Sequence, residues 1–273
     1  MISYNEFTDY LLEEKGMSYL EVALAMFCME EEYGGYLNAL EANGYEEADR
    51  ETYEDAMDAT ANEFEVRRAS YSSFNYPYYE CNGNEYLVYD DESEAYNAAV
   101  ESVKDLIDDT GFTSILGWED YVEDDWFQDA MMEMEETYAN DIESEGDNTY
   151  DNRLVQECYD NGLIDDDDFE LDEDGEIDYT QCTVDTDELI DRLANYLYDD
   201  NLSYYKSAAE WYRSDFGDKD FETVVKDNDL IDKQKISEYV VDEDGIGHTL
   251  ASYDGEDNEY EFDGITYYIY RTN

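Results

Sequence analysis

Apolar residues recur every three or four positions along most of the chain, which is the spacing of a helix that buries one face. Ser18 and Glu21 have the spacing of a capping box at the start of one such run. In the N-terminal quarter the pattern predicts helices over residues 5–14, 19–33 and 46–64. Further along, it predicts helices over residues 92–109, 118–142 and 186–198 and one or two more within 201–240.

Strand signals are confined to short alternating runs. Residues 85–89 alternate, and Asp174-Gly175 between alternating flanks is typical of a hairpin turn. Near the C-terminus three alternating runs predict a three-strand meander over residues 249–253, 259–262 and 265–271. We therefore expect an α+β fold that is mostly helical, with a small antiparallel sheet that includes this C-terminal meander.

A turn-rich connector over residues 70–84 contains the single proline, Pro77. We predict a boundary there, between a helical N-terminal region (residues 1–70) and an acidic α+β domain (residues 85–273). Hydrophobic residues make up 42% of the chain and aromatic residues 16%. This composition supports a packed core and argues against an acidic disordered tail, which would be poor in aromatics.

The charge is not explained by the needs of folding. There are 78 acidic and 14 basic residues, which gives a formal net charge of −64. Such self-repulsion opposes the compact state, so we infer that the charge has a use. Surface scaling for a chain of this size gives about 12,000 Å², or about 190 Å² per net charge. A duplex of one charge per ~1.7 Å of axis has on the order of 110 Å² per charge, so the two densities agree within a factor of two.

Nearly half of the net charge lies in residues 119–200, which hold 32 acidic and 2 basic residues. In the helix predicted over residues 118–142, carboxylates four residues apart are about 6 Å apart along the axis, opposite an apolar face that includes Trp126 and Phe127. We predict that carboxylates of this segment take the place of DNA phosphates on a partner. The predicted contact residues are Asp125, Asp129, Glu133, Glu136, Asp165, Asp166, Asp167, Asp168, Asp172 and Asp174.

No catalytic or metal-binding constellation can be identified in the sequence. His248 is the only histidine and has no identifiable nucleophile or orienting partner. The four cysteines lack zinc-site spacing. An EF-hand alignment centred on Gly175 puts Gln181 where a bidentate glutamate is required, so an acidic hairpin is the better interpretation. We expect no enzymatic activity, no metal and no cofactor.

The N-terminus has no basic leader or long apolar run, and no segment approaches the ~18 apolar residues of a membrane span. We therefore expect a cytoplasmic protein with reduced thiols. Anionic lipid would repel it, so we expect no membrane partner.

Extreme acidity combined with folded amphipathic helices, such as the one predicted over residues 118–142, resembles the DNA-mimic antirestriction proteins of bacteriophages and mobile elements. Two stretches are also similar to uncharacterised small phage proteins: EYLVYDDESEAYNAA at residues 85–99 and DGIGHTLASYDG…YYIYRTN within residues 244–273. Those proteins typically have arginine where Ile246 stands and an aromatic residue where Thr249 stands. The similarity of the two stretches implies a phage origin and no activity. The resemblance to DNA-mimic proteins implies an anti-defence role in the host cytoplasm, and it assigns no functional residue.

We therefore predict an inhibitor that occupies the DNA-binding groove of a basic protein, such as a host restriction complex or another defence nuclease, and that does not itself bind nucleic acid. An acidic chaperone or partner of one basic protein, without competition with DNA, is the main alternative. The solvated enzyme of a halophile is a second alternative, and calcium buffering is a third. A homodimer is compatible with the sequence.

The free protein should become more stable as salt is added, because screening reduces self-repulsion over a Debye length of ~10 Å at 0.1 M. We expect a higher Tm at 500 mM than at 10 mM NaCl in thermal unfolding followed by circular dichroism. A Tm that fell or did not change would mean that the carboxylates are already paired or neutralised.

Overall fold

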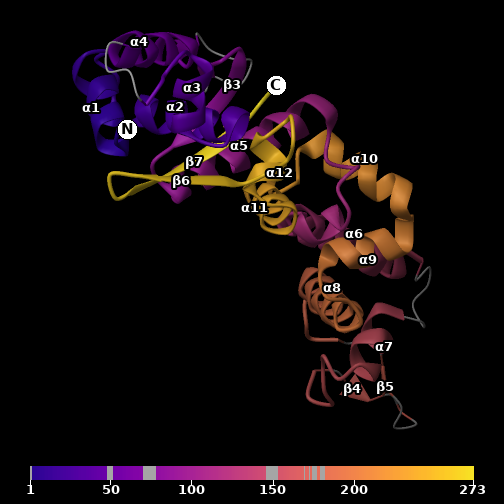
Figure 1. Ribbon diagram of the computed structural model, residues 1–273. Coiled ribbons are helices and arrows are strands. Elements are labelled where there is room, and N and C mark those ends of the chain that lie inside the picture. Colours follow the sequence, from indigo (N-terminus) through magenta and orange to yellow (C-terminus); the bar gives the residue numbers. More distant parts are fainter. Residues whose placement is uncertain are drawn as a thin grey trace. The chain divides into compact units, whose positions relative to one another are not determined.

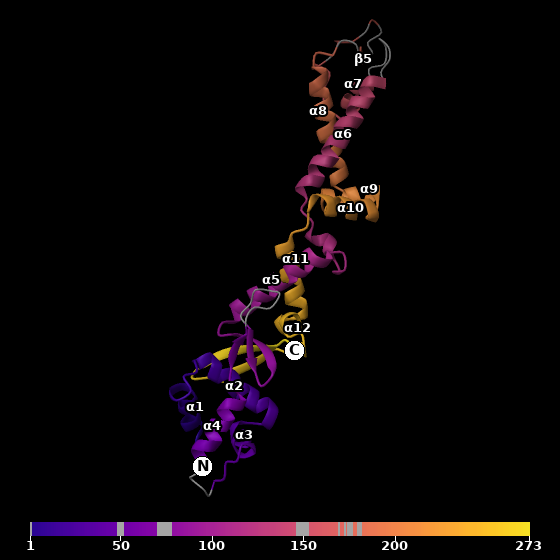
Figure 2. The ribbon, with the colours of Figure 1, turned by 90° about the horizontal axis from the view of Figure 1, so that it is seen from above.

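The computed structural model (Figures 1 and 2) describes residues 2–47, 52–69, 78–145, 153–168, 170–171, 173, 177–178 and 182–273. The predicted α+β class and the predominance of helix are confirmed. Two compact units are present: unit 1 comprises Met1–Ile115 and Lys233–Asn273, and unit 2 comprises Leu116–Asp232. The division therefore falls at residues 115/116 and 232/233, whereas the sequence pattern indicated a boundary at residues 70–84.

Unit 1 is built on a five-stranded antiparallel sheet with the order β1-β2-β3-β7-β6. In chain order its strands are β1 (Arg67–Ala69), β2 (Tyr78–Cys81), β3 (Asn84–Tyr89), β6 (Asn258–Phe262) and β7 (Ile265–Arg271). The last strand in the sequence is thus an inner strand, with Val88 of β3 opposite Ile269 of β7. Asp263 and Gly264 join β6 to β7 with φ of 49° and 77°, the positive values that a tight type I′ turn requires.

The predicted C-terminal meander is wrong in its first strand. Residues 249–253 do not pair with β6. The first two of them, Thr249 and Leu250, belong to the short helix α12 (Ile246–Leu250). The two neighbours of β7 in the sheet are β6 and β3. The alternation that suggested a strand is too short to distinguish it from one turn of helix. Only the β6–β7 pair of the predicted meander is confirmed.

Helices cover both faces of the sheet in unit 1 (Figure 1). Buried side chains alternate along β7: Tyr267 and Ile269 join the core of the N-terminal helices, whereas Tyr270 is buried outside that cluster. The N-terminal helices are α1 (Tyr4–Glu13), α2 (Tyr19–Tyr33), α3 (Tyr36–Ala42) and α4 (Tyr53–Glu63). In the described part of this unit the other helices are α5 (Glu92–Thr110), α11 (Lys233–Asp244) and α12.

Unit 2 is largely helical. Its elements are a 3-10 turn (Trp118–Tyr121), α6 (Asp125–Glu145), α7 (Arg153–Asp160), α8 (Thr186–Leu202), α9 (Ala208–Phe216), α10 (Asp218–Asn228) and the short strands β4 (Glu170–Leu171) and β5 (Ile177–Asp178). β4 and β5 pair antiparallel, as the Asp174-Gly175 signal predicted, although that turn itself lies outside the described residues. α6 and α8 pack along each other (Figure 2).

The helix predicted over residues 118–142 is divided in two. Val122 forms a bridge with Ile231, and the Glu123 N–H donates to the Leu230 carbonyl at 2.8 Å, so the chain is extended before α6 begins. The apolar spacing predicts a buried stripe that runs from Trp126 through Ala130 and Met134 to Tyr138, but Tyr138 is 48% exposed. The side chains that α6 buries are Phe127, Met131, Glu135, Ala139 and Ile142.

None of the helices within the described ranges combines the length and the apolar character that a bilayer crossing requires.

Gly247 of α12 should be intolerant of a side chain. A Cβ there would lie 2.6 Å from the Glu256 carbonyl carbon and 2.7 Å from the Asp257 nitrogen. Glycine to alanine normally favours a helix by about 1 kcal/mol, but here backbone must move. We expect Gly247→Ala to lower the free energy of unfolding by about 2 kcal/mol in urea titration. Gly264→Asn is the control, because nothing lies within 4 Å of that Cβ and asparagine tolerates positive φ. Equal stability of the two variants would contradict the close approach.

Candidate partner-binding surface

Four of the predicted contact residues lie together on α6. Asp125, Asp129, Glu133 and Glu136 are all exposed, at positions separated by four, four and three residues along one helix. None of the four forms an ion pair with any residue in the described part of the chain. We call these four side chains the α6 ladder. The structure therefore brings together four unpaired carboxylates on one solvent-facing helix surface.

The apolar face of α6 holds this ladder in place. Phe127 is fully buried, with its ring centroid 5.2 Å from Tyr212 and 5.3 Å from Phe221. Burial of such a ring contributes roughly 1.5–3 kcal/mol, whereas each like-charge pair four residues apart costs only a few tenths of a kcal/mol. The helix is therefore stable despite its charge because α9 and α10 supply aromatic partners for its opposite face.

Three basic residues of unit 2 pair with acids outside the ladder. Arg192 pairs with Glu188 one turn earlier on α8 at 2.6 Å, and Lys226 pairs with Glu222 on α10 at 2.6 Å. The Arg213 guanidinium contacts Glu119 at 3.3 Å and Asp218 at 2.6 Å. These contacts neutralise acids of other elements and leave the α6 ladder uncompensated.

The predicted contact residues that follow α7 form a different arrangement. Asp165, Asp166 and Asp167 are exposed and Asp168 is half-buried. The Asp165 N–H donates to an Asp168 carboxylate oxygen at 3.1 Å, the Asp167 N–H donates to Asp165 at 3.0 Å, and the Tyr159 hydroxyl donates to Asp166 at 3.1 Å. These carboxylates therefore also shape their own turn, unlike the ladder.

Asp172 and Asp174, the last two predicted contact residues, lie outside the described residues.

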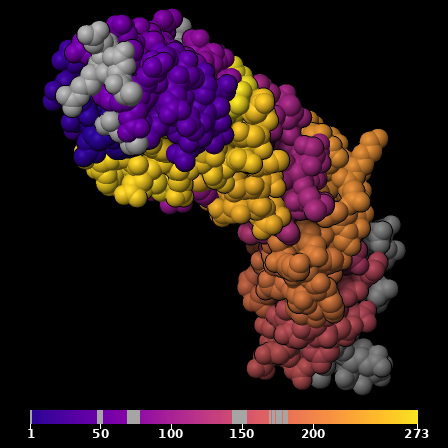
Figure 3. All heavy atoms as spheres, in the orientation of Figure 1, coloured from indigo at the N-terminus to yellow at the C-terminus, as the bar shows by residue number. Residues whose placement is uncertain are grey.

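A second acidic helix was missed by sequence reasoning. α8 packs beside α6 and exposes acids along its length; part of its surface is visible in orange in Figure 3. The exposed acids of α8 that form no ion pair with a described residue are Asp187, Asp191, Asp199 and Asp200. The spacing of Asp187 and Asp191 could have been read from the helix predicted over residues 186–198, whereas Asp199 and Asp200 lie in the last turn of α8, beyond the predicted end.

Both units are acidic, but unit 2 is more densely charged. Its 117 residues hold 40 acidic and 6 basic side chains, against 38 and 8 in the 156 residues of unit 1. The accessible surface of the chain is 16073 Å², which is about 250 Å² per net charge over 64 charges and exceeds the estimate from size scaling alone. The average density is therefore slightly less than half that of a DNA rod, so a match to DNA depends on local clustering.

Glu135 is the exception among the acids of α6. Its side chain is 6% exposed and accepts a hydrogen bond from the Asn201 amide of α8 at 3.1 Å. Burial raises the pKa of the Glu135 carboxyl, the nearby Asp215 carboxylate raises it further, and the Asn201 hydrogen bond lowers it. The spacing of apolar residues did not predict that Glu135 is buried, because that spacing placed the buried face of the helix at a different angle around its axis.

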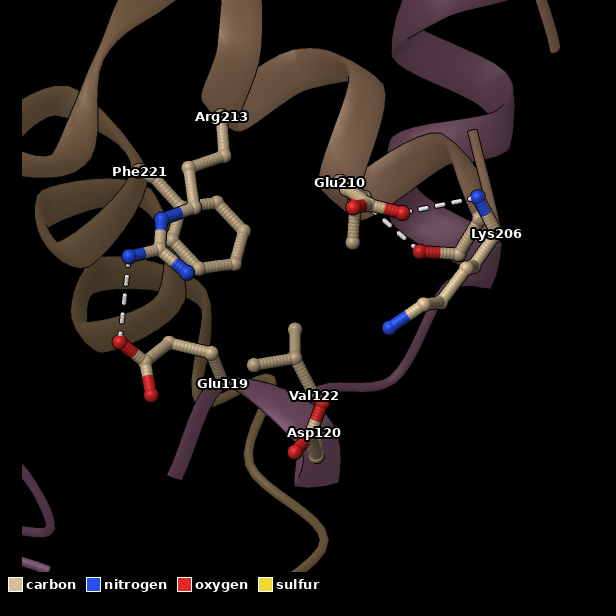
Figure 4. Close-up of a pocket in the computed structure, with 9 residues that line it drawn as sticks. Glu119, Asp120, Val122, Lys206, Glu210, Arg213 and Phe221 are labelled. Atoms are coloured by element: carbon tan, nitrogen blue, oxygen red, sulfur yellow. Dashed lines mark hydrogen bonds and ion pairs between the residues drawn. The ribbon is translucent and has the colours of Figure 1, made fainter. Parts of the chain in front are cut away.

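A cavity of about 380 Å³ lies in unit 2 between the 3-10 turn, α9 and α10 (Figure 4). The Arg213 guanidinium lies 5.9 Å from the Phe221 ring centroid and is paired with Glu119 across the cavity. Lys206 extends into the same space in Figure 4. Ser207, which also lines it, is engaged as the N-cap of α9, its Oγ accepting the Glu210 N–H at 3.1 Å. The Arg213–Glu119 ion pair thus compensates part of the charge of this cavity within the fold.

No group of three or more histidine, cysteine or acidic side chains has metal-binding geometry in the described part of the chain. The cysteines among these residues, Cys28, Cys81, Cys158 and Cys182, are free thiols. Burial raises the pKa of the Cys158 thiol to about 11, which keeps it protonated near neutrality. Comparison of the chain with protein families, with curated proteins and with solved structures finds no match.

Glu135→Gln should stabilise the protein at neutral pH. A raised folded-state pKa means that stability falls as pH rises from the unfolded value of about 4.3 through the folded value, and the loss is complete above it. Glutamine removes the buried charge and can still accept from Asn201, so we expect a gain on the order of 1 kcal/mol at pH 7 in urea titration. The gain should shrink as the pH approaches 4. The neighbouring exposed Glu136→Gln is the control, with a change of only a few tenths of a kcal/mol; a destabilised Glu135→Gln protein would show that the carboxylate is favoured in its charged form.

Proposed function

We propose that the chain is a DNA mimic that occupies the DNA-binding groove of a basic protein and thereby inhibits it. The α6 ladder and the exposed acids of α8 supply the phosphate-like charges. By resemblance, the partner is a host restriction complex or another defence nuclease met in the cytoplasm of an infected cell. The protein acts by occupying a groove and not by catalysis.

The α6 ladder is the observation that carries this proposal. Four carboxylates are held on a helix, open to solvent and without cationic partners among the described residues. In an ordinary soluble domain the exposed acids would be interspersed with bases, which lowers the local field. Unpaired charges fixed on a rigid element are what electrostatic steering into a basic cleft requires.

The dimensions of α6 suit a groove that holds duplex DNA. A helix of 21 residues is about 31 Å long, comparable to about nine base pairs at 3.4 Å each. Its carboxylates recur about every 6 Å, more sparsely than the phosphates of one strand. The adjoining α8, with its own exposed acids, raises the density of charge on unit 2.

Phosphate contacts position a protein on DNA and carry no direct sequence information. A mimic of phosphates would therefore compete with DNA at several unrelated enzymes. The main alternative, an acidic partner that binds a basic protein elsewhere, predicts a complex that DNA does not disrupt. Competition with duplex DNA is thus the property that separates the two.

The proposal is tested by immobilising the full chain, capturing proteins from bacterial lysate at moderate salt, and eluting with a short duplex. Captured proteins should bind DNA when assayed singly, and the duplex should release them. In solution the purified partner should be inhibited stoichiometrically and competitively with DNA. A complex that excess duplex leaves intact would support the acidic-partner alternative, and inhibition that is sub-stoichiometric and grows with time would indicate an enzyme.

Neutralising the α6 ladder should weaken partner binding. The variant Asp125→Asn, Asp129→Asn, Glu133→Gln, Glu136→Gln keeps side-chain size and relieves repulsion along the helix. We expect a rise of about tenfold or more in Kd, mainly through slower association, and a shallower fall of log affinity with log salt, because fewer counterions are released. Surface plasmon resonance between 50 and 200 mM salt measures both.

The matched control removes four exposed acids from α5 of unit 1, each without an ion pair to any described residue: Glu92→Gln, Glu94→Gln, Asp105→Asn, Asp109→Asn. The control should bind nearly as well as the unmodified protein. Equal losses in the two variants would mean that only bulk charge matters, and affinity that is independent of salt would exclude a phosphate-like contact altogether.

A further inference from the structure

Unit 1 contains a cavity of about 300 Å³ that is separate from the α6 ladder. Side chains of α1, the first residue of α2 and the end of β6 with its turn line this cavity. Those that define its chemistry are Tyr4, Asp9, Leu12, Tyr19, Phe262 and Asp263. The cavity thus combines aromatic walls with two carboxylates and has no lysine or arginine in its lining.

Its aromatic walls are fixed by contacts within the fold. The Tyr19 ring is 48% exposed, and its centroid lies 5.9 Å from that of the buried Phe262. Tyr4 is 36% exposed, packs edge-on against Tyr36 at 5.7 Å, and has its hydroxyl 3.5 Å from the Tyr260 hydroxyl. These contacts hold two large aromatic rings at the surface without covering them.

The two carboxylates are also positioned by the backbone. Asp263 is the first residue of the tight β6–β7 turn, and its φ of 49° fixes the direction in which the chain leaves β6. Asp9 is exposed on α1. Neither carboxylate forms an ion pair with a described residue; the nearest lysine in sequence to Asp9, Lys15, is paired with Asp58.

The chemistry of this combination suits an organic cation. Aromatic faces attract ammonium and guanidinium groups through the ring quadrupole, and carboxylates at the rim compensate the charge. The same unit already uses this contact internally, since the Arg271 guanidinium lies 3.8 Å from the Tyr253 ring centroid. The cavity volume of about 300 Å³ lies near the small end of the usual range for ligand sites, and it suits a single side chain.

We propose that this cavity is a receptor for an arginine or lysine side chain of a basic protein partner. Charge complementarity commits the site to a cation, because an anion would meet two unpaired carboxylates within a strongly negative chain. The site lies outside the surface assigned to DNA mimicry, and its occupancy does not depend on competition with DNA.

The test is a titration of the isotopically labelled full chain with N-acetyl-arginine amide at 150 mM NaCl, followed by backbone amide NMR. The neutral isostere N-acetyl-citrulline amide is the ligand control. We expect saturable shifts centred on Asp9, Tyr19 and Asp263 with the arginine compound, a weaker form of the same response with N-acetyl-lysine amide, and none with the citrulline compound.

Tyr19→Leu should weaken this binding about two- to fivefold, the range of an exposed cation–π contact. Asp263→Asn should weaken it by up to about fivefold, the range of an exposed ion pair. Asp244→Asn, an exposed acid at the end of α11 and outside the cavity, should leave it unchanged. Unperturbed amides elsewhere would show that the variants fold. The proposal would be overturned if the cavity showed no saturable shifts, if the citrulline compound gave an equal response, or if Asp244→Asn weakened binding equally. Each of these outcomes is independent of whether DNA competes for unit 2.

Discussion

Mutual repulsion among 64 net negative charges is the constraint on which the structure depends, and burial of large aromatic and aliphatic side chains opposes it. The balance is clearest in α6, where Phe127, Met131 and Ile142 are buried opposite the four carboxylates of the ladder. Each repulsive pair costs little in water, whereas each buried ring contributes much more. The surface can therefore be almost uniformly acidic provided that every helix has a well-packed apolar face.

The few basic residues show how this balance is maintained locally. Arg192, Lys226 and Lys104 pair with acids three or four residues away on their own helices. Exposed pairs of this kind contribute little to the stability of either unit. Because these bases pair with acids of their own helices, the four acids of the α6 ladder have no cationic partner among the described residues. This distribution of charge supports the proposed role in displacing DNA.

Sequence patterns predicted the class of the fold and most helices because amphipathic spacing and capping boxes are local signals; Ser18 and Glu21 form the predicted capping box at the start of α2. The spacing of Asp125, Asp129, Glu133 and Glu136 likewise predicted one exposed acidic face. Local patterns could not predict features that depend on tertiary contacts. The bridge of Val122 to Ile231, for example, interrupts the helix predicted over residues 118–142. The pairing of β7 with β3 across 175 intervening residues of chain has no local signature either.

That long-range pairing has a consequence for the order in which the protein is assembled. Unit 2 is one continuous segment, inserted between α5 and α11 of unit 1. β7, an inner strand of the sheet, is synthesised after the other four strands, and β6 reaches the rest of the sheet only through it. During translation, unit 2 can therefore fold while the sheet of unit 1 is still missing two of its five strands, and β3 has an unpaired edge until β7 leaves the ribosome. Unit 2, the more densely acidic of the two, is therefore completely synthesised before unit 1, into which it is inserted.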